Sequence, residues 1–341
     1  MLSVIIPTRN RSEFLRLALQ SLQSQTYPLD RFEVLVIDNG STDDTKQVIE
    51  SFQQSFGNIR YFFDPTPGLH VGRHVGLREA KEDILVYADD DIEATPTWLE
   101  GIAESFQDQE VVLVGGKNLP KYEVAPPDWI EKMWKEDEYG NRILGYLSLL
   151  DLGDEIKEID PNYVYGCNFS IRKSTLLEAG GFHPDAMPQE LIKYRGDGES
   201  HVSTYILSNG YKAVYNPKAS VYHMVPSSRM TKEYFCRRAF NEGISHSYTE
   251  LRNNYSGKND TNKYNVFSVY FKIIKSMTII ELFKAIGRKI NKIFDGNIHN
   301  SHGYIEKMID KSFQHGKRIH NEEIKNDPKL LEWVLRSDYY D

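Results

Sequence analysis

The sequence predicts an α/β protein with a mostly parallel central sheet flanked by helices. Three observations lead to this fold class. Short apolar runs alternate with amphipathic, helix-forming segments along the N-terminal third of the chain, as in doubly wound sheets. Polar loops follow the apolar runs, and ligands of such sheets bind at the carboxyl ends of the strands. No apolar run reaches the roughly 18 residues of a membrane-spanning helix, so no such helix is expected.

Four apolar segments have the length and composition of buried parallel strands. They are residues 2–6, 32–37, 59–63 and 83–88. Between them, apolar residues recur at helical spacing or glycines lead into a helix, which predicts helices over 13–25, 45–56 and 73–80. Ser12 can cap the first of these helices.

The alternation continues less regularly in the second part of the chain. Helices are expected at 96–107, 174–179, 200–208 and 231–243, and strands at 111–114, 164–171, 211–216 and 220–223. Residues 117–160 are predicted to form long loops and short helices. Residues 253–263 are expected to be a polar loop, and one or two surface helices are expected near the C-terminus.

Composition limits the function. The net charge of −8 argues against a protein that binds nucleic acid in bulk. The only two cysteines, Cys167 and Cys236, are far apart and form no CxxC motif, so a zinc site or disulfide framework is not expected. The N-terminal segment lacks a basic region and reaches Pro7 early, unlike a signal peptide. These features predict a cytoplasmic protein in a reducing compartment.

The polar loops at successive strand ends carry the chemistry. Thr8 and Arg9 follow the first strand, Asp38 ends the second, and three consecutive carboxylates, Asp89, Asp90 and Asp91, follow the fourth. Carboxylates suit Mn²⁺ or Mg²⁺, and such a cation can hold a diphosphate. A solvated acidic turn is the alternative for the carboxylates alone, but the ordered occurrence of all three loops favours a metal and diphosphate site. No glycine-rich phosphate fingerprint occurs, which argues against dinucleotide enzymes and P-loop proteins.

Six motifs resemble those of the family 2 glycosyltransferases, which have the GT-A fold. They are SVIIPTRNR at 3–11, VIDNGSTD at 36–43, GLHVGR at 68–73, YADDD at 87–91, GCNFSIR at 166–172 and GGF at 180–182. The resemblance covers residues 1–245 and keeps the order of the motifs. It implies a nucleotide-binding half at 1–115 and an acceptor-binding half at 116–245, followed by a helical extension at 246–341.

The resemblance implies an inverting transferase that moves a sugar from a nucleotide-diphosphate donor, expected to be a UDP-sugar, to an acceptor hydroxyl. It also implies roles for particular residues. Contacts to the donor are expected from Pro7, Thr8, Arg9, Asp38, Arg73, Asp89 and Asp90, and ligation of Mn²⁺ or Mg²⁺ from Asp91. His223 is expected to complete the metal site with a neutral imidazole, although a packed histidine is the alternative.

The catalytic base of the family lies in a Glu-Asp motif at the start of a helix. The matching stretch here is Gly196-Asp197-Gly198-Glu199, in which the glutamate of the motif is replaced by glycine. An inverting displacement needs a carboxylate that deprotonates the acceptor hydroxyl. Asp197 is the predicted base and Glu199 the reserve; the alternative is a carboxylate that caps its own helix.

Trp129, Asn168 and Glu199 are predicted to contact the acceptor, with core packing as the alternative for the tryptophan. Arg229, Arg237 and Arg238 are candidates to neutralise a diphosphate, or else are solvated.

The amphipathic segment 266–294 has a basic polar face, so it is expected to pack on the main body or to contact an anionic membrane surface. The family's usual work points to a surface polysaccharide or lipid-linked glycan as the product, made at the inner face of a membrane. Two other functions stay open: a nucleotidyltransferase, and a sugar-nucleotide binding protein without catalysis.

Overall fold

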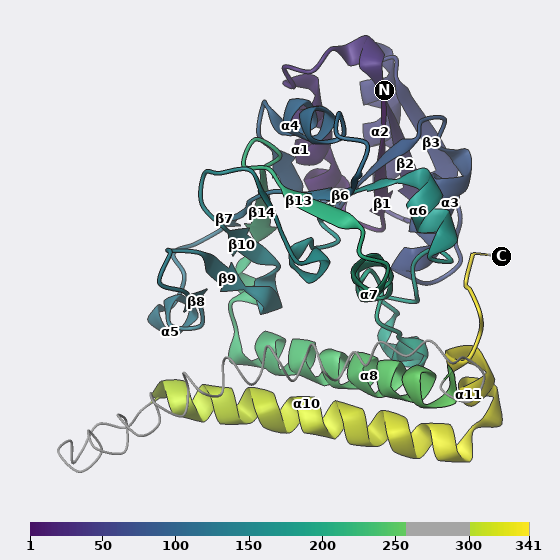
Figure 1. The fold of residues 1–341 in the computed structure, drawn as a ribbon, viewed down its shortest axis with the longest axis vertical. Coiled ribbons are helices and arrows are strands. Elements are labelled where there is room, and N and C mark those ends of the chain that lie inside the picture. The colour runs from purple at the N-terminus through teal and green to yellow at the C-terminus, as the bar shows by residue number, and fades with distance from the viewer. Residues whose placement is uncertain (257–300, 341) are drawn as a thin grey trace.

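In the computed structural model, which describes residues 1–256 and 301–340, two β-sheets and their flanking helices lie beside a long pair of C-terminal helices (Figure 1). The larger sheet has the strand order β11-β13-β6-β12-β4-β1-β2-β3. Its strands are β1 (Leu2–Thr8), β2 (Phe32–Asp38), β3 (Ile59–Phe63), β4 (Ile84–Ala88), β6 (Val111–Gly115), β11 (Lys157–Glu158), β12 (Asn168–Arg172) and β13 (Lys212–Tyr215).

The parallel nucleus predicted from the sequence is confirmed. Strands β3, β2, β1 and β4 run parallel, while β12 is antiparallel to both of its neighbours, β4 and β6. This arrangement brings the ends of β1, β2 and β4, and the polar residues that follow them, to one edge of the sheet.

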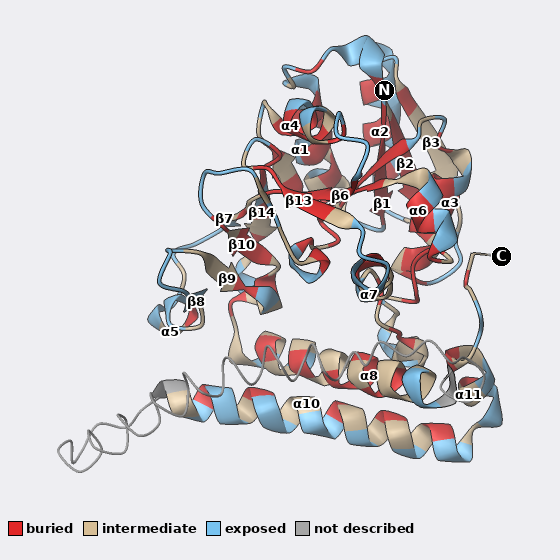
Figure 2. Ribbon diagram, viewed as in Figure 1, coloured by how far each residue is buried: buried red, intermediate tan, exposed pale blue. Residues whose placement is uncertain are grey.

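Helices cover both faces of this sheet because successive side chains of a strand point to opposite faces. Val4 and Ile6 of β1 pack with residues of α1, α2 and α4, whereas Ile5 packs with residues of α3, α6 and α7. These helices are α1 (Ser12–Gln23), α2 (Thr45–Ser55), α3 (Leu69–Glu79), α4 (Trp98–Ser105), α6 (Lys173–Glu178) and α7 (Ser200–Ser208). Strands β1, β2, β4 and β6 between them are almost completely buried (Figure 2).

Glycines at a spacing of four residues let α3 lie close to β1. A Cβ at Gly76 would overlap the side chain of Ile5, and a Cβ at Gly72 would lie 2.7 Å from Asn39 Oδ1. The helix begins at Leu69, four residues earlier than residue 73, where it was expected. The glycines therefore belong to the helix and its contact with the sheet.

The smaller sheet was not predicted. It has the order β5-β14-β7-β10-β9-β8 and includes strands from the region expected to be loops and short helices. Its strands are β5 (Ile92–Ala94), β7 (Asn118–Tyr122), β8 (Lys135–Glu136), β9 (Arg142–Leu144), β10 (Leu149–Asp151) and β14 (Val221–Val225), and α5 (Asp128–Glu131) lies beside it. Strands of two or three residues are too short to show an alternating pattern.

Five short 3₁₀ turns connect these described elements. They are η1 (Leu29–Arg31), η2 (Gly145–Leu147), η3 (Pro161–Tyr163), η4 (Gln189–Tyr194) and η5 (Ser227–Arg229).

The C-terminal part consists of α8 (Lys232–Ser256), α10 (Ser301–Asn326) and α11 (Pro328–Val334). Helices α8 and α10 lie side by side and run in the same direction (Figure 1). Near their starts the two helices pack together around Phe235 and Ile305. Near their ends they pack together around Tyr248 and Ile324. Helix α8 continues through residue 245, so the expected domain junction falls inside one helix.

In the described ranges, no helix is long and apolar enough to cross a membrane. The basic amphipathic segment predicted at 266–294 lies outside the described residues.

Candidate functional site

A cavity of about 510 Å³ opens where the carboxyl ends of β1, β2 and β4 face α8. Eight of the predicted site residues line it. They are Pro7, Thr8, Arg9, Arg73, Asp89, Asp90, Asp197 and Glu199. The opposite wall includes Arg238, Glu242 and Ser245 of α8. The cavity is therefore bounded by both the N-terminal sheet and α8.

Asp90 links the loop after β1 to the end of β4. The Thr8 hydroxyl donates to Asp90 Oδ2 at 2.8 Å, and Arg11 Nη1 lies 2.7 Å from Asp90 Oδ1. Burial raises the pKa of Asp90 to about 7, although Arg11 and Thr8 favour the ionised form. Asp90 is thus a buried carboxylate whose ionised form depends on these two partners.

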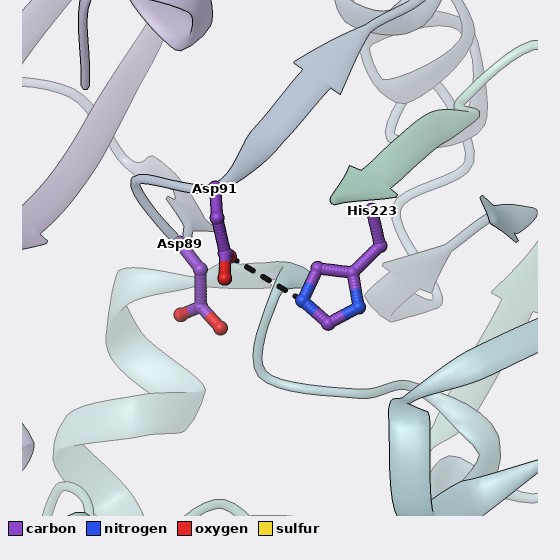
Figure 3. Close-up of side chains that lie close together, drawn as sticks. All are labelled: Asp89, Asp91 and His223. Carbon is purple, nitrogen blue, oxygen red and sulfur yellow. Dashed lines mark ion pairs between the residues drawn. The ribbon is translucent and has the colours of Figure 1, made fainter. Parts of the chain in front are cut away.

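Asp89, Asp91 and His223 form a cluster able to hold a metal ion (Figure 3). One ligand atom from each lies within 4.8 Å of the others. Asp91 immediately precedes β5, and His223 lies on β14, which pairs with β5 and places His223 opposite Ile92. The sequence predicted all three residues at the site, and the second sheet brings the distant histidine to the two aspartates.

The donor atoms of this cluster suit a divalent cation. His223 Nδ1 lies 2.9 Å from the Leu147 carbonyl oxygen, which accepts a hydrogen bond from the Nδ1–H group, so the lone pair of the neutral imidazole is on Nε2. Nε2 faces Asp91 Oδ1 at 3.3 Å (Figure 3). That oxygen is buried and has no hydrogen-bond partner among the described residues. Carboxylate oxygens and a neutral imidazole are ligands that Mn²⁺ accepts.

The second oxygen of Asp91 is held by two arginines. Arg11 Nη2 and Arg229 Nη2 each lie 2.7 Å from Asp91 Oδ2. Burial opposes ionisation, but the charge of His223, whenever its imidazole is protonated, and the guanidinium groups of Arg11 and Arg229 hold the pKa of Asp91 well below its usual range. Asp91 is therefore an ionised, buried carboxylate whose Oδ2 is held by two arginines and whose Oδ1 faces the imidazole of His223.

Arg73 connects Asp89 to Glu199 beneath the cavity. Its Nη1 lies 3.2 Å from Glu199 Oε2, and its Nη2 lies 3.8 Å from Asp89 Oδ1. The side chain is 3% exposed, and its guanidinium lies over the ring of Phe182. The Gly166 N–H donates to Glu199 Oε1 at 3.0 Å. Arg73, predicted to contact the donor, thus has carboxylate partners within the protein.

Asp197, the predicted base, lies on the same wall with different partners. Its Oδ1 lies 2.6 Å from His183 Nδ1, and its Oδ2 accepts from the Thr249 hydroxyl of α8 at 2.7 Å. Despite burial, which opposes ionisation, these two contacts lower the pKa of Asp197. The imidazole of His183 stacks on that of His201 with ring centroids 3.6 Å apart.

Five predicted site residues do not line the cavity: Asp91 and His223 lie behind Asp89 in the metal cluster, and Asp38, Trp129 and Asn168 have partners elsewhere. Asp38 is buried, and its two oxygens accept from the Ser41 N–H at 2.7 Å and the Tyr61 hydroxyl at 3.1 Å. Trp129 packs edge-on against Phe235 in an apolar cluster, which is the packing alternative considered for it.

Asn168, predicted to contact the acceptor, is buried between the two sheets' strands. Its amide oxygen accepts from the Trp98 indole N–H at 2.9 Å, and its amide nitrogen donates to Asn118 Oδ1 at 3.2 Å and the Ala219 carbonyl at 2.9 Å. These contacts use its hydrogen-bonding groups inside the protein, so they do not fit a role in acceptor binding.

Several polar residues of the cavity were not predicted. They are Arg11, Asn39, Asp185, Arg195, Glu242 and Ser245. Arg11 and Asn39 lie within the motifs at 3–11 and 36–43. Both follow a strand of the parallel sheet, and this position could have indicated that they line the cavity. The others come from α8 and from the chain just before and just after η4, where the sequence offers no pattern that points to the cavity. Of the three candidate arginines, Arg229 and Arg238 line it, whereas Arg237 is exposed.

A family model described as "Glycosyl transferase family 2" matches residues 3–176. Among curated proteins, the chain is 36% identical over 115 residues to glycosyltransferase AglE of Haloferax volcanii, covering 33% of this chain and 38% of that protein. It is 23% identical over 264 residues to the glucosyl-dolichyl phosphate glucuronosyltransferase of the same organism, covering 73% of this chain and 77% of that protein. The match thus spans well under half of the first relative's length and most of the second's.

Among solved structures, the chain is similar to the mannosyltransferase PcManGT of Pyrobaculum calidifontis, determined in complex with GDP-Man and Mn²⁺. The TM-score is 0.55 and the sequence identity 17%, and the match covers 98% of this chain and 84% of that one. This likeness confirms the fold class predicted from the sequence.

Proposed function

The chain belongs to glycosyltransferase family 2, and we propose that it transfers a sugar from a nucleoside diphosphate donor to an acceptor hydroxyl with inversion at the anomeric carbon. One observation carries the proposal: a cation-binding cluster and a separate carboxylate adjoin the same cavity. The cation-binding cluster consists of Asp89, which lines the cavity, and of Asp91 and His223 behind it. The separate carboxylate is that of Glu199. Diphosphate departure and acceptor deprotonation need such groups on opposite sides of one anomeric carbon.

The proposed metal site consists of Asp89, Asp91 and His223. Mn²⁺ or Mg²⁺ held there would neutralise the negative charge that develops on the leaving diphosphate. Thr8, Arg9 and Asn39 line the neighbouring wall, where a nucleoside can be bound. The buried Asp91 Oδ1 supports this assignment, because it has no hydrogen-bond partner among the described residues and faces the imidazole of His223, and a buried ionised oxygen of this kind is costly unless a cation binds it.

We propose Glu199 as the general base, in place of the predicted Asp197. Arg73 joins Glu199 to Asp89, so Glu199 lies one guanidinium group away from the metal cluster. Asp197 is held instead by His183 and Thr249, and its lowered pKa makes it a weaker base. In this assignment Asp197 positions the loop that precedes α7.

The test compares Glu199→Gln with Asp197→Asn. We expect Glu199→Gln to lower sugar transfer roughly a hundred- to ten-thousandfold, as removal of a general base does, while nucleotide binding is retained. Asp197→Asn should lower transfer much less. Steady-state transfer and calorimetric nucleotide binding measure the two effects. If Asp197→Asn loses transfer and Glu199→Gln retains it, Asp197 is the base.

The donor is proposed to be a nucleoside diphosphate sugar, and the resemblance in sequence favours a UDP-sugar. The similar mannosyltransferase structure contains GDP-Man, which adds GDP-sugars as candidates. A hydrolysis screen with UDP- and GDP-sugars in Mn²⁺ identifies the donor. Release of the nucleoside diphosphate supports a glycosyltransferase reaction, release of pyrophosphate would indicate nucleotidyl transfer, and binding of a donor without turnover would indicate a catalytically silent protein.

The acceptor is proposed to be a glycan or a lipid-linked glycan. The name of one relative, a glucosyl-dolichyl phosphate glucuronosyltransferase, supports the lipid-linked form. Once the donor is known, transfer to a free oligosaccharide and to the same oligosaccharide on a polyprenyl phosphate distinguishes the two.

A further inference from the structure

Arg229 contacts two of the residues that the proposed metal site requires. Its Nη2 lies 2.7 Å from Asp91 Oδ2, and its Nη1 lies 3.4 Å from His223 Nε2. Since His223 Nδ1 is directed to the Leu147 carbonyl, Nε2 is the nitrogen that a metal ion would use. The guanidinium of Arg229 therefore lies against a ligand nitrogen that the cation needs.

A second guanidinium increases the positive charge at the site. Arg11 spans two carboxylates, with Nη1 at 2.7 Å from Asp90 and Nη2 at 2.7 Å from Asp91. In the part of the chain that the structure describes, Arg11 forms no hydrogen bond with His223, whereas Arg229 does, so the two arginines differ. Both repel an incoming divalent cation, but only Arg229 also lies at the imidazole nitrogen.

We propose that Arg229 is an internal counter-ion of the metal site, and that it must leave His223 before a divalent cation binds there. The cation and the nucleoside diphosphate then bind cooperatively, because the diphosphate offers the displaced guanidinium a new partner. This inference rests on the proposed function. It adds that Arg229 leaves His223 before the cation binds.

The position of Arg229 permits this exchange. It ends η5, the short turn between β14 and α8, and its side chain is 22% exposed and lines the cavity. A guanidinium can form two parallel hydrogen bonds with phosphate oxygens. The negative charge of a diphosphate would also offset the repulsion between the cation and both arginines. Coupling is reciprocal, so each ligand raises the affinity for the other by the same factor.

The experiment measures Mn²⁺ binding by the paramagnetic resonance signal of free Mn²⁺, without any turnover. In the absence of nucleotide, Arg229→Met should bind Mn²⁺ about tenfold or more tightly than the wild type, because the competing guanidinium is gone. Arg11→Met should give a smaller increase. Arg237→Met, which changes an exposed arginine on α8, is the matched control and should behave as the wild type.

A second titration adds GDP and UDP in turn. Whichever of them binds should raise the Mn²⁺ affinity of the wild type strongly and that of Arg229→Met several-fold less. Circular dichroism checks that each variant is folded, and Arg229→Gln replaces Arg229→Met if the latter does not fold.

The outcomes separate the inference from the function on which it rests. If Arg229→Met binds Mn²⁺ alone no better than the wild type, or if Arg11→Met gains as much, the specific role of Arg229 is overturned. Asp91→Asn tests the metal site itself and should lose Mn²⁺ binding. Wild-type affinity in Asp91→Asn would remove the proposed metal site, whatever the arginine variants do.

Discussion

Gly166 has no room for a side chain, because the buried pair of Arg73 and Glu199 lies against its Cα. An added Cβ would overlap Arg73 Nη2 and would lie 2.9 Å from Glu199 Oε1. Arg73 is 3% exposed and packs on Phe182, so it cannot move away freely. A single backbone position thus controls the placement of the proposed base.

We therefore expect Gly166→Ala to lower sugar transfer by about tenfold or more, since small displacements of a catalytic group have effects of this size. The free energy of unfolding should fall by about 1–3 kcal/mol, as it does at other overpacked sites. Steady-state kinetics and urea unfolding measure the two. Gly145→Ala is the control, because its nearest neighbour, Tyr165 Oη, would be 3.7 Å from the new Cβ. Equal activity in both variants would contradict the assigned role of Gly166.

The sequence predicted the cavity residues that directly follow a strand, because the carboxyl ends of parallel strands meet at one edge. Asp89, Asp90 and Thr8 are of this kind. Asp38 and Asn168 show the limit of such reasoning: their side chains find internal hydrogen-bond partners that are far away in the sequence or in other elements. A motif names the residue type at a position but does not show which way its polar atoms are turned.

At the scale of elements, α8 and α10 approach closely at two glycines. A Cβ at Gly316 would overlap the Phe240 carbonyl oxygen, and one at Gly243 would overlap the Phe313 carbonyl oxygen. These are backbone atoms, which cannot rotate away as a side chain can. Because α8 also forms one wall of the cavity, the contact between the two helices determines the position of that wall.

Gly316→Ala should therefore destabilise the protein by about 1–3 kcal/mol, despite the higher helix propensity of alanine. Urea unfolding, followed by circular dichroism, measures the change. Gly303→Ala, on the same helix with nothing within 4 Å of its new Cβ, should leave stability unchanged or raise it by up to about 1 kcal/mol. A Gly316→Ala protein as stable as Gly303→Ala would show that the helices can separate at no cost.

Predictability from sequence also differs between elements. The strands of the parallel nucleus are continuous apolar runs, and β3 was predicted with its observed bounds, Ile59–Phe63. Strands β8, β9 and β10 are two or three residues long, and their partners are set by the packing of the whole sheet. Local pattern carries no information on such pairings, so the second sheet was missed although it supplies His223.

At the scale of the whole molecule, the end of the chain packs against its third helix. His74 Nδ1 lies 2.8 Å from the Tyr339 carbonyl oxygen, and the Tyr248 hydroxyl donates to that of Tyr339 at 2.8 Å. The Tyr339 ring also lies edge-on to His183, the partner of Asp197. The C-terminal helices therefore support the loop that carries Asp197, which no local feature of the sequence could indicate.

Histidines with a lowered pKa occur at and near these contacts between the N-terminal and C-terminal parts. Burial lowers the pKa of His70 to about 3, and burial lowers the pKa of three others to about 4. These three are His74, His201 and His320. His320 lies on α10, with Nδ1 2.8 Å from Ser247 Oγ and Nε2 3.2 Å from the Lys193 carbonyl oxygen. The folded protein thus keeps four imidazoles neutral that the unfolded chain would protonate in mild acid.

Stability should consequently fall as the pH is lowered from 6.5 to about 4. Above pH 6.5 these imidazoles are mostly neutral in both the folded and the unfolded state. Below pH 6.5 the unfolded chain takes up protons that the folded chain excludes. Each such histidine then lowers the free energy of unfolding by about 1.4 kcal/mol per pH unit.

Removing one of these histidines should make the free energy of unfolding less dependent on pH. We expect the loss of unfolding free energy between pH 7.5 and pH 5 to be about 2 kcal/mol smaller in His320→Gln than in the wild type. Urea unfolding at the two pH values measures it, with His315→Gln, an exposed position on the same helix, as the control. If the free energy of unfolding falls by the same amount between the two pH values in both variants, His320 is not kept neutral by the contact between α10 and the rest of the protein.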